Sequence, residues 1–420
     1  MKSKKTLEER FDDLSKTTVP ALQVGSFVKF ISTFSIENLS PGFVTTSEID
    51  TRLWTIEGLT ENLQAGLKAE FLICPKSKSE EELTNRGQSK SDVKVLIEPA
   101  EDVASLINNV NGEENFQVKF VPKVPGTYSI TVKINGDKLV TSPLRVYVKE
   151  RRIDVVGELV LKGEIPKESN GIAVNSEGTI AVSDIEKHCI LIFDKDGNFV
   201  RKCGCHGQLK EPAGVTFLNN DELLVLDEKN HCIQQFNVQT GNFVKSFGKE
   251  GTGDGEFQSP QGICVNDKGH IVVVDLSHIR IQVLNKDGTF MFKFGDNAHG
   301  KLDTPSGCIY HKNKFIVSDI ENHCLKVFDS SGKFLYKFGE EGEADGQFSF
   351  PWGLCIEKYG DHHSLLVCDF SNGRIQQFTM EGRFVGKTVT TLGNPKAIAT
   401  TPDGRILVCN CSDGKIYFLK

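Results

Sequence analysis

The sequence predicts an all-β protein in which an immunoglobulin-like β-sandwich is followed by a six-bladed β-propeller. Two observations support this prediction. A repeat with a period near 45 residues runs through the second part of the chain, and short apolar runs separated by turn signals fill the part before it. The 39 glycines and 28 phenylalanines among 420 residues fit short strands joined by tight turns.

The repeat has fixed internal spacing. Each unit opens on a small residue before an apolar strand, at Gly171, Gly214, Gly262, Gly307, Gly353 and Ala397. A second apolar strand then ends on an acid or an amide, at Asp184, Asp227, Asp275, Asp319, Asp369 and Asn410. In all six units an apolar residue follows nine positions later. A constant inner offset within such a period is typical of propeller blades.

The last unit stops at Lys420, after its third strand. The missing fourth strand is available upstream, in the apolar segment 153–161. We therefore predict a propeller over residues 151–420 that is closed by strand 153–161, because ring closure protects edges that would otherwise aggregate.

The region before the propeller divides into two parts. Residues 42–149 contain six short apolar runs and a hairpin signal at Asn135-Gly136, which indicate about seven short strands and an immunoglobulin-like sandwich. Within them, the polar stretch 75–92 is expected to be a long mobile loop. Residues 1–41 show a short helical pattern and are interpreted as a linker or the remnant of a coiled coil.

Composition excludes several classes of function. Lys+Arg and Asp+Glu give 49 − 56 = −7, so a DNA-binding role is not expected. No run of about 20 apolar residues and no signal peptide is found, so we expect no membrane association. Residues 1–150 hold one cysteine, Cys74, and no histidine, which excludes a zinc module there. The other 11 cysteines favour a reducing compartment, and we expect the cytoplasm.

The loops after three of the acids carry a family signature. Asn230-His231-Cys232 and Asn322-His323-Cys324 resemble the Asn-His-Leu motif of NHL repeats, and Lys187-His188-Cys189 is similar. Residues 120–148 resemble a filamin-type immunoglobulin domain. Together they resemble the C-terminal region of TRIM-NHL proteins, without the RING finger and B-boxes with which complete members begin. Because ubiquitin-ligase activity in that family resides in the RING, the resemblance implies a non-enzymatic recognition scaffold acting in ubiquitination or gene regulation.

The repeated acids and histidines are interpreted as structural. We expect the carboxylates to cap backbone amides of the loop that follows them, and the histidines to pack or hydrogen-bond within the blades. This set comprises Asp184, His188, Asp227, His231, Asp275, Asp319, His323, Asp369 and Asn410. Equivalent positions spread around a ring do not converge on one metal, so neither a metal nor a cofactor is expected. A metal-dependent lyase or hydrolase, as in other six-bladed propellers, remains the remote alternative.

The charge distribution helps to decide between two candidate ligands, proteins and RNA. Residues 151–420 carry 30 − 35 = −5 charges, and the inter-blade loops are acidic, which favours protein targets on the propeller face. One basic sector favours the alternative, an RNA stem-loop-binding post-transcriptional repressor. The candidates for the binding face are Arg280, Arg374, Lys387, Lys396 and Lys415.

Overall fold

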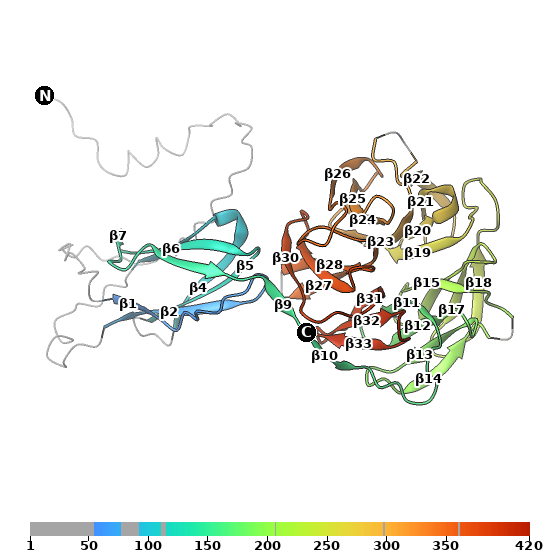
Figure 1. Ribbon diagram of the computed structural model, residues 1–420, viewed down its shortest axis with the longest axis horizontal. Helices are drawn as coiled ribbons and strands as arrows, with labels where there is room; N and C mark the ends of the chain where they lie inside the picture. The colour runs from blue at the N-terminus through green and yellow to red at the C-terminus, as the bar shows by residue number, and fades with distance from the viewer. Residues whose placement is uncertain (1–53, 77–91, 111–114, 206, 297–298, 360–361) are drawn as a thin grey trace, which may run out of the picture. The chain divides into compact units, whose positions relative to one another are not determined.

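The computed structural model of the chain describes residues 54–76, 92–110, 115–205, 207–296, 299–359 and 362–420. These residues form an all-β structure (Figure 1), with two short 3₁₀ turns, η3 (Ala100–Asp102) and η4 (Leu276–His278). The predicted fold class is therefore confirmed. The helical pattern expected in residues 1–41 and most of the loop expected over 75–92 lie outside the described residues.

The first two sheets form the sandwich. One has the order β1-β2-β5-β4, and in the other β3, β7 and β8 all pair with β6. The bounds are β1 (Trp54–Glu57), β2 (Ala69–Pro75), β3 (Val93–Glu98), β4 (Val103–Val110), β5 (Asn115–Pro122), β6 (Gly126–Ile134), β7 (Asp137–Lys138) and β8 (Leu144–Val148).

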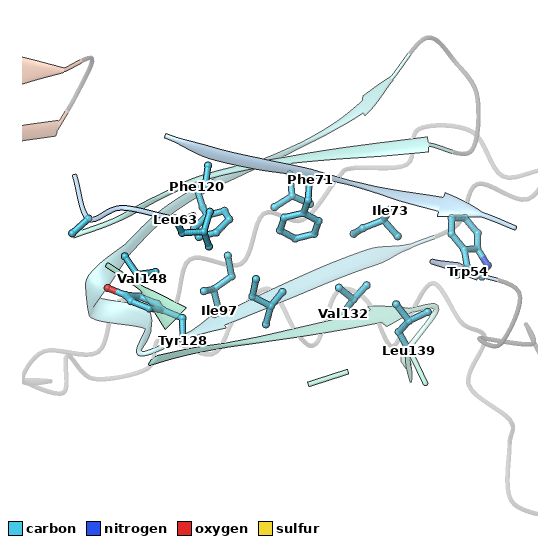
Figure 2. Packing of buried hydrophobic residues seen from close by; sticks show 14 of the residues in the cluster. Trp54, Leu63, Phe71, Ile73, Ile97, Phe120, Tyr128, Val132, Leu139 and Val148 are labelled. Atoms are coloured by element: carbon cyan, nitrogen blue, oxygen red, sulfur yellow. The ribbon is translucent and has the colours of Figure 1, made fainter. Parts of the chain in front are cut away.

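Alternating side chains of these strands fill the space between the two sheets. In β6, Tyr128, Ile130 and Val132 are buried, while the residues between them face outward. Phe71 and Phe120 pack edge to face at 6.1 Å, and Trp54 closes one end of the core (Figure 2). The predicted hairpin turn at Asn135-Gly136 joins β6 to β7, and both residues have positive φ.

Six further sheets follow, each an antiparallel meander that supplies one blade. The first three blades are β11 (Ser169–Val174), β12 (Ile180–Asp184), β13 (Cys189–Phe193) and β14 (Phe199–Cys203); β15 (Pro212–Phe217), β16 (Glu222–Asp227), β17 (Cys232–Asn237) and β18 (Phe243–Phe247); and β19 (Pro260–Val265), β20 (Ile271–Asp275), β21 (Arg280–Leu284) and β22 (Phe290–Phe294).

The last three blades repeat this pattern. They are β23 (Pro305–His311), β24 (Lys314–Asp319), β25 (Cys324–Asp329) and β26 (Phe334–Phe338); β27 (Pro351–Tyr359), β28 (His362–Asp369), β29 (Arg374–Thr379) and β30 (Phe384–Thr388); and β31 (Pro395–Thr400), β32 (Ile406–Asn410) and β33 (Ile416–Leu419). The second and third strands are buried almost throughout, because each sheet is packed between two neighbours.

The sixth sheet takes its outer strand from upstream in the chain. β10 (Val155–Glu158) pairs antiparallel with β33, with Val155 opposite Leu419. The amide of Leu159 extends the pairing by donating to the carbonyl of Ile416 at 2.8 Å. A second upstream strand was not predicted: β9 (Arg151–Ile153) adds parallel to β30 as a fifth strand of the fifth blade.

The six first strands contact one another in a closed ring around the axis. The repeated glycines permit this approach. A Cβ added to Gly262 would lie 2.0 Å from the carbonyl oxygen of Ser306 on the next blade, and one on Gly214 would lie 2.5 Å from that of Gln261. Glycine at these positions is therefore a packing requirement of the ring.

In the part of the chain that the structure describes, no helix has the length and apolar character needed to cross a membrane.

Candidate functional site

The acids that end the second strands lie where each blade meets the loop leading into it. The Asp227 carboxylate is fully buried; Oδ1 accepts the amide N–H of Lys210 at 3.0 Å, and Oδ2 accepts from Asn230 and Gln234 at 2.8 and 2.6 Å. Burial raises the pKa of Asp227, and these hydrogen bonds oppose the rise.

The loop that the acids cap differs from the one expected. Asp275 and Asp369 accept the amides of Gln258 and Ser349, which precede them by 17 and 20 residues in the incoming inter-blade loop. Asp319 accepts two such amides, and the amide oxygen of Asn410 accepts that of Asn394. Asp184 caps both loops, since it accepts from Lys167 as well as Lys187. The following loop contributes mainly side-chain donors, the Nδ2 groups of Asn230, Asn322 and Asn372.

The signature histidines connect neighbouring blades. Nδ1 of His188, His231 and His323 accepts the backbone N–H of Glu211, Ser259 and Phe350, at 3.1, 3.1 and 3.2 Å. All three histidines have φ near +50°. Among the described residues, no three His, Cys, Asp or Glu side chains come together in a group that could hold a metal ion.

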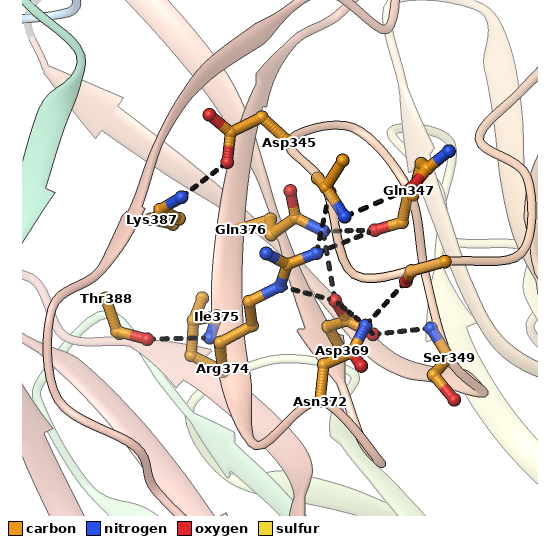
Figure 3. A network of polar contacts seen from close by, with 12 residues as sticks. Asp345, Gln347, Ser349, Asp369, Asn372, Arg374, Ile375, Gln376, Lys387 and Thr388 are labelled. Carbon is orange, nitrogen blue, oxygen red and sulfur yellow. Dashed lines mark hydrogen bonds and ion pairs between the residues drawn. The ribbon is translucent and has the colours of Figure 1, made fainter.

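Two candidate cations, Arg280 and Arg374, hold inter-blade loops in place. Arg374 donates from Nε to Asp369 at 2.7 Å and from Nη2 to the carbonyls of Ala344 and Gln347 at 2.8 and 3.0 Å (Figure 3). Arg280, 5% exposed, repeats this arrangement on Asp275 and three carbonyls of the loop that precedes β19. These guanidinium groups therefore have little capacity left for a ligand.

The other three candidates also have partners, and the five do not form one cluster. Lys387 contacts Asp345 at 2.5 Å, and Lys415 contacts Glu158 of the closing strand at 2.8 Å. The Lys396 ammonium lies over the ring of Trp352, 4.8 Å from its centroid. Arg374 and Lys387 bind the same loop, the one that precedes β27, through Ala344 and Asp345 (Figure 3).

The second-to-third-strand loops and the inter-blade loops share one face of the propeller, which we call the loop face. At its centre is a cavity of about 90 Å³ lined by the first strands, well below the roughly 300 Å³ at which small-molecule sites begin. Beside the cavity, Trp352 and Phe370 pack at 5.4 Å, both half-buried.

This aromatic pair was missed by the sequence reasoning, although the repeat contains a signal for it. The residues just before the small residue that opens each unit are Asn170, Ala213, Gln261, Ser306, Trp352 and Lys396. The residues just after the acid or amide that ends each second strand are Ile185, Glu228, Leu276, Ile320, Phe370 and Cys411. The fifth unit alone has an aromatic residue at both positions.

The profile of the Filamin/ABP280 repeat family matches residues 49–145, and that of the NHL repeat matches residues 209–236 and 257–284. Each NHL match runs from an inter-blade loop to the third strand, and so contains the loop amide and the acid that binds it.

Known proteins match parts of the chain. It is 35% identical over 146 residues to "Protein brain tumor" of Drosophila melanogaster, which is 33% of this chain and 13% of that protein. It is 31% identical over 141 residues to "B-box type zinc finger protein ncl-1" of Caenorhabditis elegans (32% and 16%), and 50% identical over 50 residues to "Protein lin-41" of the same organism (12% and 4%). The matched regions thus span less than a fifth of each relative.

Among solved structures, a protein of unknown function from Bacteroides thetaiotaomicron superposes with a TM-score of 0.51 at 15% identity. The match covers 87% of this chain and 98% of that one, and supports the fold alone. The relationship to known proteins rests on the sequence matches, which agree with the signature residues. The chain contains a filamin repeat and NHL repeats and is related to the TRIM-NHL proteins.

Proposed function

We propose that the chain is a non-catalytic recognition scaffold whose loop face binds protein targets in a ubiquitination or gene-regulation pathway. The observation that carries this proposal is the state of the candidate cations. Arg280, Arg374, Lys387 and Lys415 are all engaged by carboxylates of the chain itself. Binding to a phosphate backbone depends on cations that are free to replace counterions, and here each would first have to leave an internal partner.

An RNA hairpin is the second candidate, and one observation favours it. Lys396 has no carboxylate partner among the described residues, and it lies beside two aromatic rings on which an unpaired base can stack. The exposed carboxylates of the neighbouring loop, Glu341 and Glu343, oppose this alternative because they repel a phosphate backbone.

The proposal places the scaffold in the cytoplasm. The thiols of the propeller are mostly buried, and burial raises the pKa of Cys203 to about 12. Such thiols remain protonated and unreactive, as expected of packing residues in a reducing compartment.

Crosslinking in cells tests the proposal, with protein and RNA recovered from the same pull-down of the full chain. We expect protein partners that persist at moderate salt, and RNA no higher than with the tag alone. Glu321→Arg, on the exposed loop after β24, should reduce capture. Its control, Asp267→Arg, lies in the turn between β19 and β20 at the opposite end of a blade and should leave capture unchanged. Specific RNA crosslinking without protein partners would establish the RNA alternative instead.

A further inference from the structure

The fifth blade and the first strand of the sixth bring an aromatic pair and a cation together on the loop face. The Trp352 and Phe370 rings are 5.4 Å apart at an angle of 42°, and the Lys396 ammonium lies 4.8 Å from the Trp352 centroid. Tryptophan attracts a cation over its face more strongly than the other aromatic residues do. The chain's own lysine therefore shows that this ring is accessible to a positive charge.

An acidic loop adjoins these rings. The loop before β27 carries Glu340, Glu341, Glu343 and Asp345. Asp345 pairs with Lys387 and Glu340 accepts from Gln347, but within the described ranges Glu341 and Glu343 are exposed and have neither an ion pair nor a side-chain hydrogen bond. Two carboxylates are thus left to face solvent.

Hydrogen bonds fix this loop against the turn that carries Phe370. Asn372 donates from Nδ2 to the carbonyl of Gly342 at 2.8 Å, the residue between the two free carboxylates. The amides of Ser371 and Phe370 donate to the carbonyls of Ser349 and Phe350 at 3.0 and 3.3 Å. The acids and the rings therefore belong to one continuous surface.

We propose that the surface made by Glu341, Glu343, Trp352 and Phe370 binds an arginine- or lysine-containing segment of a protein partner, whose cation displaces the Lys396 ammonium from the Trp352 ring. The cationic side chain packs on the aromatic pair, and the two carboxylates attract the charge and set its direction of approach. A phosphate backbone would instead meet two uncompensated carboxylates. The inference rests on the proposed function and specifies the chemistry of its target.

The third blade provides an internal control for this surface. Its inter-blade loop has the same form, with Glu250 at the position of Glu341 and the same bridge to a buried phenylalanine. However, Gln261 and Leu276 replace the two aromatic residues, and Thr252 replaces Glu343. We therefore expect binding at the fifth blade and not at the third.

Tryptophan fluorescence gives a direct readout, because the chain has only two tryptophans. Trp54 is buried in the sandwich core, so Trp54→Phe in the full chain leaves Trp352 as the sole reporter. The probe is a nonapeptide of alternating arginine and glycine, with the glutamate–glycine peptide as control. We expect the arginine peptide to change Trp352 emission and to shield it from acrylamide, and the glutamate peptide to have no effect.

Charge variants then locate the site. Glu341→Gln with Glu343→Gln should weaken peptide binding by about fivefold or more, while Glu250→Gln should leave it unchanged. Lys396→Met decides between the ligand classes by the sign of its effect. It should strengthen binding of the arginine peptide by removing a competing cation, whereas it would weaken binding of a labelled RNA stem-loop.

The outcomes separate this inference from the proposed function. If the arginine peptide leaves Trp352 emission unchanged, or if Lys396→Met weakens its binding, the assigned surface is wrong. Should protein capture in cells nevertheless persist and remain sensitive to Glu321→Arg, the scaffold proposal stands and only its target chemistry fails. If the chain binds the RNA stem-loop more tightly than the peptide, and Lys396→Met abolishes the RNA binding, both the proposed function and this inference are wrong.

Discussion

Nδ1 of His231 lies 3.1 Å from the backbone nitrogen of Ser259, so the signature loop of the second blade is hydrogen-bonded to the entrance of the third. The same contact recurs at His188 and His323 with the blade that follows each. The residue that gives the repeat its signature thus connects blades along the ring.

Replacing His231 separates the two requirements of its position, an acceptor at Nδ1 and a backbone with φ of +52°. His231→Ala loses both, and we expect a loss of about 1–2 kcal/mol in the free energy of unfolding. His231→Asn is the matched control, because asparagine tolerates this backbone region and places an oxygen near the position of Nδ1. Urea unfolding should show a smaller loss for asparagine; equal losses would refute the role of the hydrogen bond.

The strand that the sequence did not predict supplies a second prediction. Arg151 of β9 binds Glu357 through two hydrogen bonds of 2.5 and 2.8 Å, with both side chains about one-tenth exposed. Arg151→Ala leaves the buried Glu357 carboxylate without its charged partner, with only the neutral donors Ser364 and Gln377 still bound to it. We expect a loss of about 3–5 kcal/mol in unfolding free energy. The double variant Arg151→Met/Glu357→Met should recover most of it, as thermal or urea unfolding would show. A double variant as unstable as the single one would contradict this account.

Hydrogen exchange should locate the effect of that pair. A Cβ added to Gly386 would lie 2.1 Å from the carbonyl oxygen of Arg151, because β9 lies directly against β30. Both Arg151→Ala and Gly386→Ala are therefore expected to expose the amides of β9. Protection of β9 that survives both changes would show that other contacts hold this strand.

The repeat was readable from the sequence because its spacing is set by the blade. The axial glycines, the acids that end the second strands and the closing strand all follow from a ring of equivalent sheets. β9 could not be predicted, because a strand of three residues that occurs in only one blade leaves no periodic pattern in the sequence. The sequence predicts that the acids cap the loop that follows them, but most of the backbone amides that they accept belong to the incoming loop. Those amides lie 15–20 residues away in sequence, beyond the range of local turn patterns.

The candidate site was less predictable than the fold. The charges of Arg280 and Arg374 were visible in the sequence, but the carbonyls that engage them belong to loops about 25–30 residues upstream. Trp352 and Phe370 lie 18 positions apart and meet only because the first and second strands of one blade run side by side. Contacts that depend on how a loop folds, and not on the repeat, can be identified only from the three-dimensional structure.

A histidine pair predicts how stability depends on pH. Nδ1 of His363, at the start of β28, and Nε2 of His311, at the end of β23, are 2.9 Å apart. Burial, His363 and the nearby Lys312 and Lys358 lower the pKa of His311. The folded state therefore binds fewer protons than the unfolded one below about pH 6.5, and stability should fall as the pH drops through that value towards the folded pKa.

Urea unfolding at neutral and mildly acidic pH checks this expectation. The wild-type chain should lose stability on acidification, and His311→Gln should lose less, because it removes the titrating group while keeping a polar side chain. The comparison is made as the difference between the two pH values within each variant, so any constant effect of the substitution cancels. An identical pH dependence in both proteins would refute the assignment to His311.

Arg374 offers the clearest distinction between a structural and a ligand-binding cation. Its guanidinium joins the buried Asp369 to the carbonyls of Ala344 and Gln347, so Arg374→Met removes three hydrogen bonds at once. We expect a loss of about 2–4 kcal/mol in unfolding free energy and faster amide exchange in the loop before β27. Lys387→Met breaks a more exposed ion pair to the same loop and should change stability by less than about 1 kcal/mol. A stable Arg374→Met protein with an ordered loop, but weaker ligand binding, would show that this arginine serves the ligand instead.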